Sequence, residues 1–145
     1  VINVLQSISG IVQNKSLKVS IITFYAAQRD LIANLCRPIS NKMPFSITIS
    51  TTDSMQGKEA DIIILSAVRS NATSSTENIG FLVDYNRINV AVTRAKSCLI
   101  LVANCATFEQ TKCLGSLIQS CKARNMVISV PFDVPVATIT KNIML

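Results

Sequence analysis

Two apolar runs on either side of a polar turn constrain the fold of this chain most. Residues 46–50 alternate polar and apolar side chains, as a half-buried strand does, whereas residues 62–65 form a continuous apolar run typical of a strand buried on both faces. The turn between them, at 51–61, carries hydroxyl, acidic and glycine residues. In an open parallel α/β sheet, ligands bind where loops leave the carboxyl ends of the strands. The sequence therefore predicts that this turn binds a nucleotide or a nucleic-acid phosphate.

The rest of the chain alternates predicted strands with predicted helices, which favours a single α/β layer structure. Apolar spacing predicts strands over 18–24, 62–68 and 97–103, and helices over 1–13, 26–36, 85–96 and 105–124. We expect Pro38 to end the second helix, because its ring disfavours helical geometry in the preceding residue. Asp84 reads as a helix N-cap, and Gly115 weakens the middle of the last helix. Residues 69–80 read as an exposed loop and 125–145 as an irregular tail.

Composition indicates one globular domain spanning residues 1–145. Hydrophobic residues make up 49% of the 145, which is ample for a core. No apolar run reaches the roughly 18 residues of a membrane span, and the first residues lack the basic region of a secretory signal. We therefore expect an intracellular protein, cytoplasmic or nuclear, with no membrane partner. The five cysteines form no C-x-x-C pair and the chain has no histidine, so we expect reduced, mostly buried thiols and no metal site.

The charge balance favours a polyanionic partner. Fourteen Lys and Arg against eight Asp and Glu give a net charge of +6, and such an excess attracts nucleic acid by counterion release. The alternative is that the charge only keeps the domain soluble or balances acidic segments elsewhere. Because the basic residues are scattered rather than grouped, charge alone leaves both interpretations open.

Two arginines are candidates for phosphate chemistry. Arg87 and Arg94 are seven positions apart, so both project from one side of the predicted helix 85–96. A planar guanidinium binds phosphate oxygens bidentately and stabilises the charge that builds on a transferring γ-phosphoryl group. The alternative is structural ion pairing with a nearby acid: Asp61, Asp84 or Glu59.

The polar turn offers candidate contacts of its own. Glu59 can accept a hydrogen bond from a ribose hydroxyl, and Gly57 lets the backbone approach a ligand closely. Thr52 and Ser54 can bind nucleic-acid phosphates. Alternatively, an Asp or Ser here only caps the turn that the glycine permits. A metal-nuclease site is less favoured, because no lysine or histidine follows at a useful position; it would use Asp53, Glu59 and Asp61.

Three segments in order resemble a known family. They are IITFYAAQ at 21–28, TDSMQGKEADIIILSAVRSN at 52–71, and GFL at 80–82 with NRINVAVTRAK at 86–96. Together they are similar to the C-terminal RecA-like domain of superfamily 1 helicases of the up-frameshift and senataxin-like group, and the last two look like helicase motifs V and VI. The resemblance implies an α/β, RecA-like P-loop NTPase fold with a mainly parallel sheet flanked by helices and a motif-bearing core at about 18–104.

The resemblance also implies roles for single residues. Arg94 is the implied arginine finger on the γ-phosphate, and Arg87 supports it or helps to form the ATP face. The implied nucleotide contacts are Gln56, Gly57 and Glu59, with the glutamate on the ribose. The implied contacts to a single nucleic-acid strand are Thr52, Ser54, Thr23 and Tyr25.

The chain departs from the family at two motif positions and lacks one motif. Phe24 stands where the group usually has proline, and Asn86 where motif VI commonly has an arginine. No G-x-x-x-x-G-K-[ST] occurs, so ATP and Mg²⁺ would be held by an N-terminal RecA-like domain, and this chain alone is expected to be inactive. The predicted function is the second half of an ATP-dependent RNA or DNA helicase. The alternative, favoured by Phe24 and Asn86, is a non-hydrolysing module that binds nucleic acid or protein.

Overall fold

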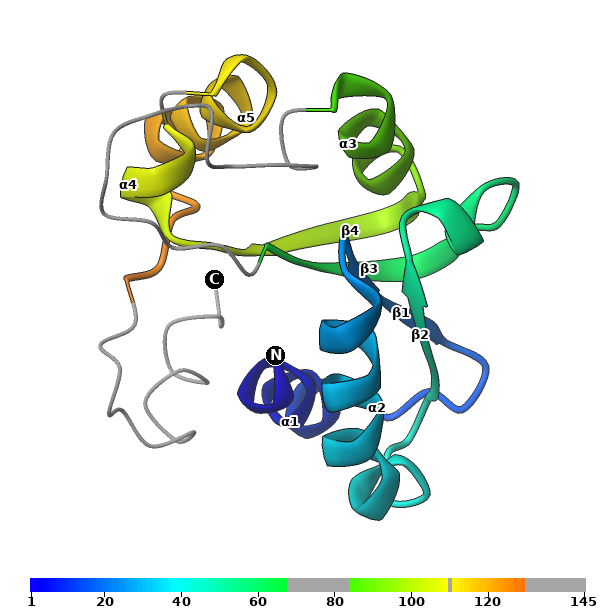
Figure 1. The fold of residues 1–145 in the computed structure, drawn as a ribbon. Coiled ribbons are helices and arrows are strands. Elements are labelled where there is room, and N and C mark those ends of the chain that lie inside the picture. Colours follow the sequence, from blue (N-terminus) through cyan, green and yellow to red (C-terminus); the bar gives the residue numbers. More distant parts are fainter. Residues whose placement is uncertain (68–83, 110, 130–145) are drawn as a thin grey trace.

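A four-stranded, all-parallel sheet forms the centre of the fold (Figure 1). The computed structural model of the protein describes residues 1–67, 84–109 and 111–129. The strands are β1 (Lys18–Thr23), β2 (Ser46–Thr51), β3 (Ala60–Ser66) and β4 (Ala95–Val102), in the spatial order β2-β1-β3-β4. Thr23 lies opposite both Thr51 and Ser66, so the carboxyl ends of β1, β2 and β3 meet at one edge of the sheet. The predicted α/β class with a parallel sheet is confirmed.

Helices cover both faces of the sheet, and each face has its own apolar core. In Figure 1, α1 (Ile2–Ile11) and α2 (Ala26–Ser40) lie on one face, whereas α3 (Tyr85–Val92), α4 (Cys105–Phe108) and α5 (Lys112–Ala123) lie on the other. Successive strand residues point to opposite faces, so Ile21 packs in the core under α1 and α2, and Ile22 in the core under α3 to α5. The result is three layers with β1 and β3 in the middle of the sheet.

The strand patterns agree with these positions. Ile63, Ile64 and Leu65 of the central strand β3 are fully buried, as its continuous apolar run predicts. β2 lies at the border of the described sheet, and its residues alternate between exposed and half-buried at its start. Both strand predictions are therefore confirmed.

The end predicted for the second helix is wrong. α2 continues through Pro38 to Ser40. Pro38 lies in the last turn, where its missing N–H removes a single backbone hydrogen bond. The chain then leaves the helix by tighter bonding, since the N–H of Lys42 donates to the carbonyl of Ile39 at 3.0 Å. The proline is therefore tolerated near the helix end instead of terminating the helix before it.

The long helix predicted at 105–124 is also wrong, because it is divided into α4 and α5. The hydroxyl and the backbone N–H of Thr111 both donate to the carbonyl of Phe108, at 2.7 Å and 3.0 Å. These bonds stop the helical pattern before α5 begins. Gly115 does not break the helix: it lies so close to the carbonyl of Glu109 that a side chain would collide with it. The glycine thus permits the packing of the two helices.

The remaining predictions concern cysteines and end segments. Four cysteines are described, and all are free: Cys36, Cys98, Cys105 and Cys121. Burial raises the pKa of the Cys36 thiol, as expected for a buried cysteine, but Cys98 is exposed, against the prediction. The predicted loop at 69–80 and most of the predicted tail lie outside the described residues. Across the part of the chain that is described, none of the helices has the length and apolar character to traverse a bilayer.

Candidate nucleotide and nucleic-acid sites

Residues 52–59, which we name the crossing turn, run over one face of the sheet from its carboxyl edge to its amino edge. At the start, the N–H of Thr52 donates to the carbonyl of Thr23 at 3.1 Å. Midway, Met55 is only 3% exposed and packs in the core below α3. At the end, Glu59 leads directly into Ala60, the first residue of β3. The prediction that the whole turn lies at the carboxyl ends of the strands is therefore wrong, because only its first residues do.

The four residues predicted to contact nucleic acid lie together near the carboxyl edge: Thr23, Tyr25, Thr52 and Ser54. Thr23 and Thr52 are 0% and 2% exposed in this structure, whereas Ser54 is exposed and Tyr25 is half-buried. The Ser54 hydroxyl is oriented by its contacts with the backbone of Thr51, accepting from the N–H and donating to the carbonyl, each at 3.0 Å. Ser54 is thus the member of this group whose polar group is exposed, because the hydroxyl oxygen of the half-buried Tyr25 is covered.

Gln28 links two strand ends at the same edge and was not predicted as a site residue. Its amide oxygen accepts a hydrogen bond from the Thr23 hydroxyl, and its amide nitrogen donates to the Ser66 hydroxyl at 2.9 Å. Gln28 lies in the first turns of α2, so it connects that helix to the ends of β1 and β3. Its sequence signal was its presence at the end of the IITFYAAQ segment.

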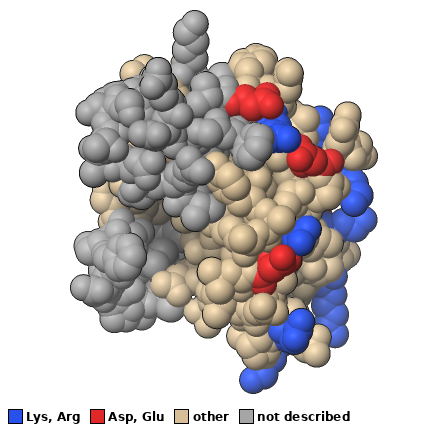
Figure 2. Space-filling view, viewed as in Figure 1, with Lys and Arg blue, Asp and Glu red and all other residues tan. Residues whose placement is uncertain are grey.

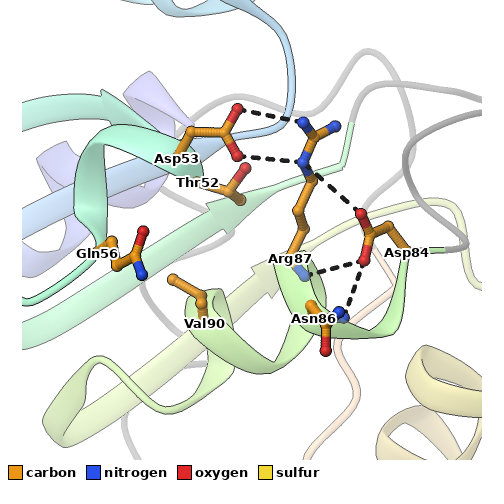
Figure 3. Close-up of a pocket in the computed structure, with 7 residues that line it drawn as sticks. All are labelled: Thr52, Asp53, Gln56, Asp84, Asn86, Arg87 and Val90. Carbon is orange, nitrogen blue, oxygen red and sulfur yellow. Dashed lines mark hydrogen bonds and ion pairs between the residues drawn. The ribbon is translucent and has the colours of Figure 1, made fainter.

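Arg87 is clamped between two carboxylates (Figure 3). Its Nε lies 3.1 Å from Asp53 Oδ1, and its Nη2 donates to Asp53 Oδ2 at 3.3 Å. Its Nε is also 3.8 Å from Asp84 Oδ2. Asp84 Oδ1 accepts the backbone N–H groups of Asn86 and Arg87, which confirms the predicted N-cap. The predicted alternative of ion pairing is confirmed for Arg87 with Asp84, although the ion pair of Arg87 with Asp53, which was not predicted, is shorter.

A shallow pocket of about 280 Å³ lies between the crossing turn and α3. It is lined by Thr52, Asp53, Gln56, Asp84, Asn86, Arg87 and Val90, as Figure 3 shows. Gln56 is exposed and lies across from Val90, farther along α3 than Arg87. The crossing turn and α3 therefore lie side by side, and their carboxyl-edge ends are joined by Arg87.

The prediction that Arg87 and Arg94 share a helix face is wrong. α3 ends at Val92, and β4 begins at Ala95, opposite Ala60 of β3. Pairing of β4 with β3 therefore overrides the helical apolar pattern, and Arg94 lies in the link between helix and strand. Its Nε donates to the carbonyl of Val90 at 3.1 Å, and its Nη2 donates to the hydroxyl of Thr93 at 3.3 Å. The Arg94 side chain is thus folded over the last turn of α3.

Arg94 and the end of the crossing turn meet at the amino edge. The carbonyl of Arg94 accepts the N–H of Ala60 at 3.2 Å, next to Glu59. Glu59 Oε2 lies 3.3 Å from Lys96 Nζ, and both side chains are more than half exposed. Gly57 has φ = 75°, a conformation that favours glycine. Lys96, like Gln28, was not predicted from the sequence as a site residue. It contacts Glu59 and belongs to the TRAK run that contains Arg94.

The acids considered for a metal site do not converge. Asp53 pairs with Arg87, Glu59 pairs with Lys96, and Asp61 accepts the backbone N–H of Lys18 at 2.8 Å. Within residues 1–67, 84–109 and 111–129, no three potential ligands gather closely enough to hold a metal ion. Figure 2 shows one face of the molecule, on which acidic side chains lie beside basic ones instead of gathering with one another.

The four-stranded, all-parallel sheet flanked by helices is an α/β fold consistent with a RecA-like domain. Residues 1–106 match the family model described as an AAA domain. The chain belongs to this family, and within it to the C-terminal RecA-like domains of superfamily 1 helicases of the up-frameshift and senataxin-like group. The resemblance inferred from the three sequence segments is confirmed.

Three similar proteins are named as a regulator of nonsense transcripts, a helicase and a DNA replication helicase/nuclease. The chain is 36% identical over 137 residues to Regulator of nonsense transcripts 1 of Caenorhabditis elegans, covering 86% of this chain and 12% of that protein. It is 37% identical over 117 residues to Helicase sen1 of Schizosaccharomyces pombe, covering 80% and 7%. It is 34% identical over 113 residues to the DNA replication ATP-dependent helicase/nuclease DNA2 of Xenopus laevis, covering 78% and 10%. The chain therefore spans about a tenth of the length of these relatives.

Proposed function

We propose that this domain is the second RecA-like half of an ATP-dependent helicase, and that Arg94 is its arginine finger. The observation that carries the proposal is the hydrogen bond from the N–H of Ala60 to the carbonyl of Arg94. It holds the candidate finger beside Glu59, the candidate ribose contact, at one edge of the sheet. Gly57 and Gln56 precede Glu59 on the same crossing turn and complete the proposed nucleotide side.

The contacts of Arg94 suit a side chain that is released to a ligand. Its guanidinium donates to a backbone carbonyl and a hydroxyl, which are both neutral acceptors. Charge-assisted bonds to phosphate oxygens are roughly twice as strong as such neutral bonds. A triphosphate that reaches this edge therefore competes well for the guanidinium, whose charge then stabilises the transferring phosphoryl group.

The carboxyl edge is the proposed binding side for a single strand of RNA or DNA. Ser54 offers an exposed hydroxyl there, and the half-buried Tyr25, whose hydroxyl oxygen is covered, lies near it with the buried Thr23 and Thr52. Because the crossing turn connects this edge with the amino edge, a change in nucleotide contacts at one end can move strand contacts at the other. Closure and release of two RecA-like halves around ATP would then step the protein along the strand.

The phosphate cradle is proposed to come from an N-terminal RecA-like domain. The 145 residues contain no G-x-x-x-x-G-K-[ST] sequence, and phosphoryl transfer depends on that lysine and on Mg²⁺ as well as on a finger. We therefore expect this chain alone to show no ATP hydrolysis above background. The residues that it contributes would bind the ribose and the γ-phosphate after the two domains close.

The proposal is tested by Arg94→Ala in the polypeptide that joins this domain to its P-loop domain. Loss of an arginine finger lowers turnover by about 10³-fold or more, so we expect kcat for ATP hydrolysis to fall by about that factor. Arg124→Ala is the matched control, because Arg124 Nε also donates to the carbonyl four residues earlier, in α5, at 3.2 Å. Turnover within twofold of wild type in Arg94→Ala would show that this residue is not the finger.

A further inference from the structure

Arg87 of α3 contacts carboxylates, whereas Arg94 of the following link contacts neutral oxygens, and this difference points to different roles. Arg87 faces the carboxylates of Asp53 and Asp84, so one positive charge is surrounded by two negative charges. Its side chain is 28% exposed and its fork contacts both oxygens of Asp53. An incoming triphosphate would be repelled by the two acids and would have to displace a bidentate partner. Arg87 is therefore poorly suited to contact ATP.

The contact between Arg87 and Asp53, which we name the clasp, fixes the start of the crossing turn. Asp53 lies between Thr52 and Ser54, two of the proposed strand contacts. The clasp attaches this segment to the first turn of α3, whose N-terminus is capped by Asp84 (Figure 3). The other end of the turn is attached by the bond between Ala60 and Arg94. The crossing turn is thus held at its start by Arg87 of α3 and at its end by Arg94, the proposed finger, in the link that follows α3.

We infer that Arg87 is a positioning residue for the nucleic-acid strand and not a part of the ATP face. The inference rests on the proposed helicase function and assigns a separate task to the clasp within it. Arg87 acts through Asp53, which sets where Ser54 and Thr52 lie relative to α3. Loss of the clasp would let the start of the turn move and would weaken strand binding, while the nucleotide contacts at the amino edge stay in place.

The test compares Arg87→Gln with Arg37→Gln in the polypeptide that includes the P-loop domain. ATP hydrolysis is measured as a function of ATP and, separately, of a single-stranded oligonucleotide of uridine or thymidine. We expect Arg87→Gln to raise the half-saturating oligonucleotide concentration about fivefold, as loss of about 1 kcal/mol would, with little change in KM for ATP. Arg37 is exposed on α2, on the opposite face of the sheet, so Arg37→Gln controls for the lost positive charge.

Asp53→Asn provides the second variant and should raise the half-saturating oligonucleotide concentration by the same factor. The double variant Asp53→Asn with Arg87→Gln should be no worse than either single variant, because both remove one contact. A rise in KM for ATP with unchanged oligonucleotide dependence would overturn the inference, as would equal behaviour of Arg87→Gln and Arg37→Gln. Should Arg94→Ala retain turnover, the proposed function itself fails, so the two failures are distinguishable. Because Asp53 is 67% exposed, Asp53→Asn keeps the test open if Arg87→Gln does not fold.

Discussion

The two edges of the sheet hold their charged groups in different ways. At the carboxyl edge, the clasp joins Arg87 to Asp53 through two contacts of 3.1 and 3.3 Å, and Asp84 lies next to it. At the amino edge, among the residues that the structure describes, Arg94 donates only to neutral oxygens, and Glu59 pairs with one exposed lysine, Lys96. A guanidinium that already has carboxylate partners serves to hold structure. One that has weak partners can exchange them for a ligand.

The candidate residues fall into two groups by edge and not by sequence motif. The crossing turn begins at the clasp and ends at Glu59, so one continuous segment contributes to both edges. The same is true of α3, which begins beside Asp84 and is followed by Arg94. Substitutions at the amino edge should therefore change the response to nucleotide, whereas those at the carboxyl edge should change the response to the strand.

The largest effect at the amino edge beyond Arg94 is expected from Glu59→Ala. Removing a carboxylate that accepts a ribose hydroxyl costs about 1.5 kcal/mol or more, so KM for ATP should rise about tenfold. KM for 2′-deoxy-ATP should rise less, because that nucleotide already lacks one hydroxyl. Glu109→Ala is the matched control. Glu109 is also paired with a lysine, Lys122, but it directly follows α4 and is not one of the proposed nucleotide contacts. Equal ATP and 2′-deoxy-ATP responses in Glu59→Ala would contradict a ribose contact.

Gly57→Ala should destabilise the fold by about 1 kcal/mol, because its positive φ is strained for a residue with a side chain. Gly10→Ala is a close control: neither glycine has an atom within 4 Å of an added Cβ, but Gly10 has no positive φ and lies in α1. It should raise stability by about 0.5 kcal/mol. Urea unfolding measures both changes, and a neutral Gly57→Ala would show that the turn does not need this conformation.

The elements that depend on local pattern were predictable. The continuous run at 62–65 identified a buried strand, and Asp84 identified a helix start, because burial on two faces and N-capping both leave direct traces in the sequence. The end of α3 was not predictable from periodicity. Val92 and the residues after it continue a helical pattern, but pairing of Ala95 with Ala60 draws the chain into the sheet. This register depends on residues far apart in sequence.

The separation of the candidate residues between the two edges of the sheet could partly have been predicted from strand topology. β2 and β3 are parallel, so a connection from the end of one to the start of the other must travel back along the sheet. A turn of this kind cannot keep all its polar residues at the carboxyl edge. The partners of Arg87 and Glu59 were not predictable in the same way. Asp53 reaches Arg87 only once the crossing turn lies beside α3, and Lys96 reaches Glu59 only once β4 pairs with β3.

The smallest effect is expected from Lys96→Gln, which tests whether this lysine orients Glu59. The pair spans 3.3 Å, with side chains 56% and 58% exposed, so its loss should cost well under 1 kcal/mol and raise KM for ATP about twofold. Salt screens exposed charges, so the difference from wild type should disappear at about 1 M ionic strength. Lys96→Arg should restore the low-salt value. Lys122→Gln removes the comparable pair with Glu109 and should leave KM for ATP unchanged. A salt-independent rise as large as that of Glu59→Ala would mean that Lys96 contacts the nucleotide itself, and the amino edge would then hold a second cation for phosphate.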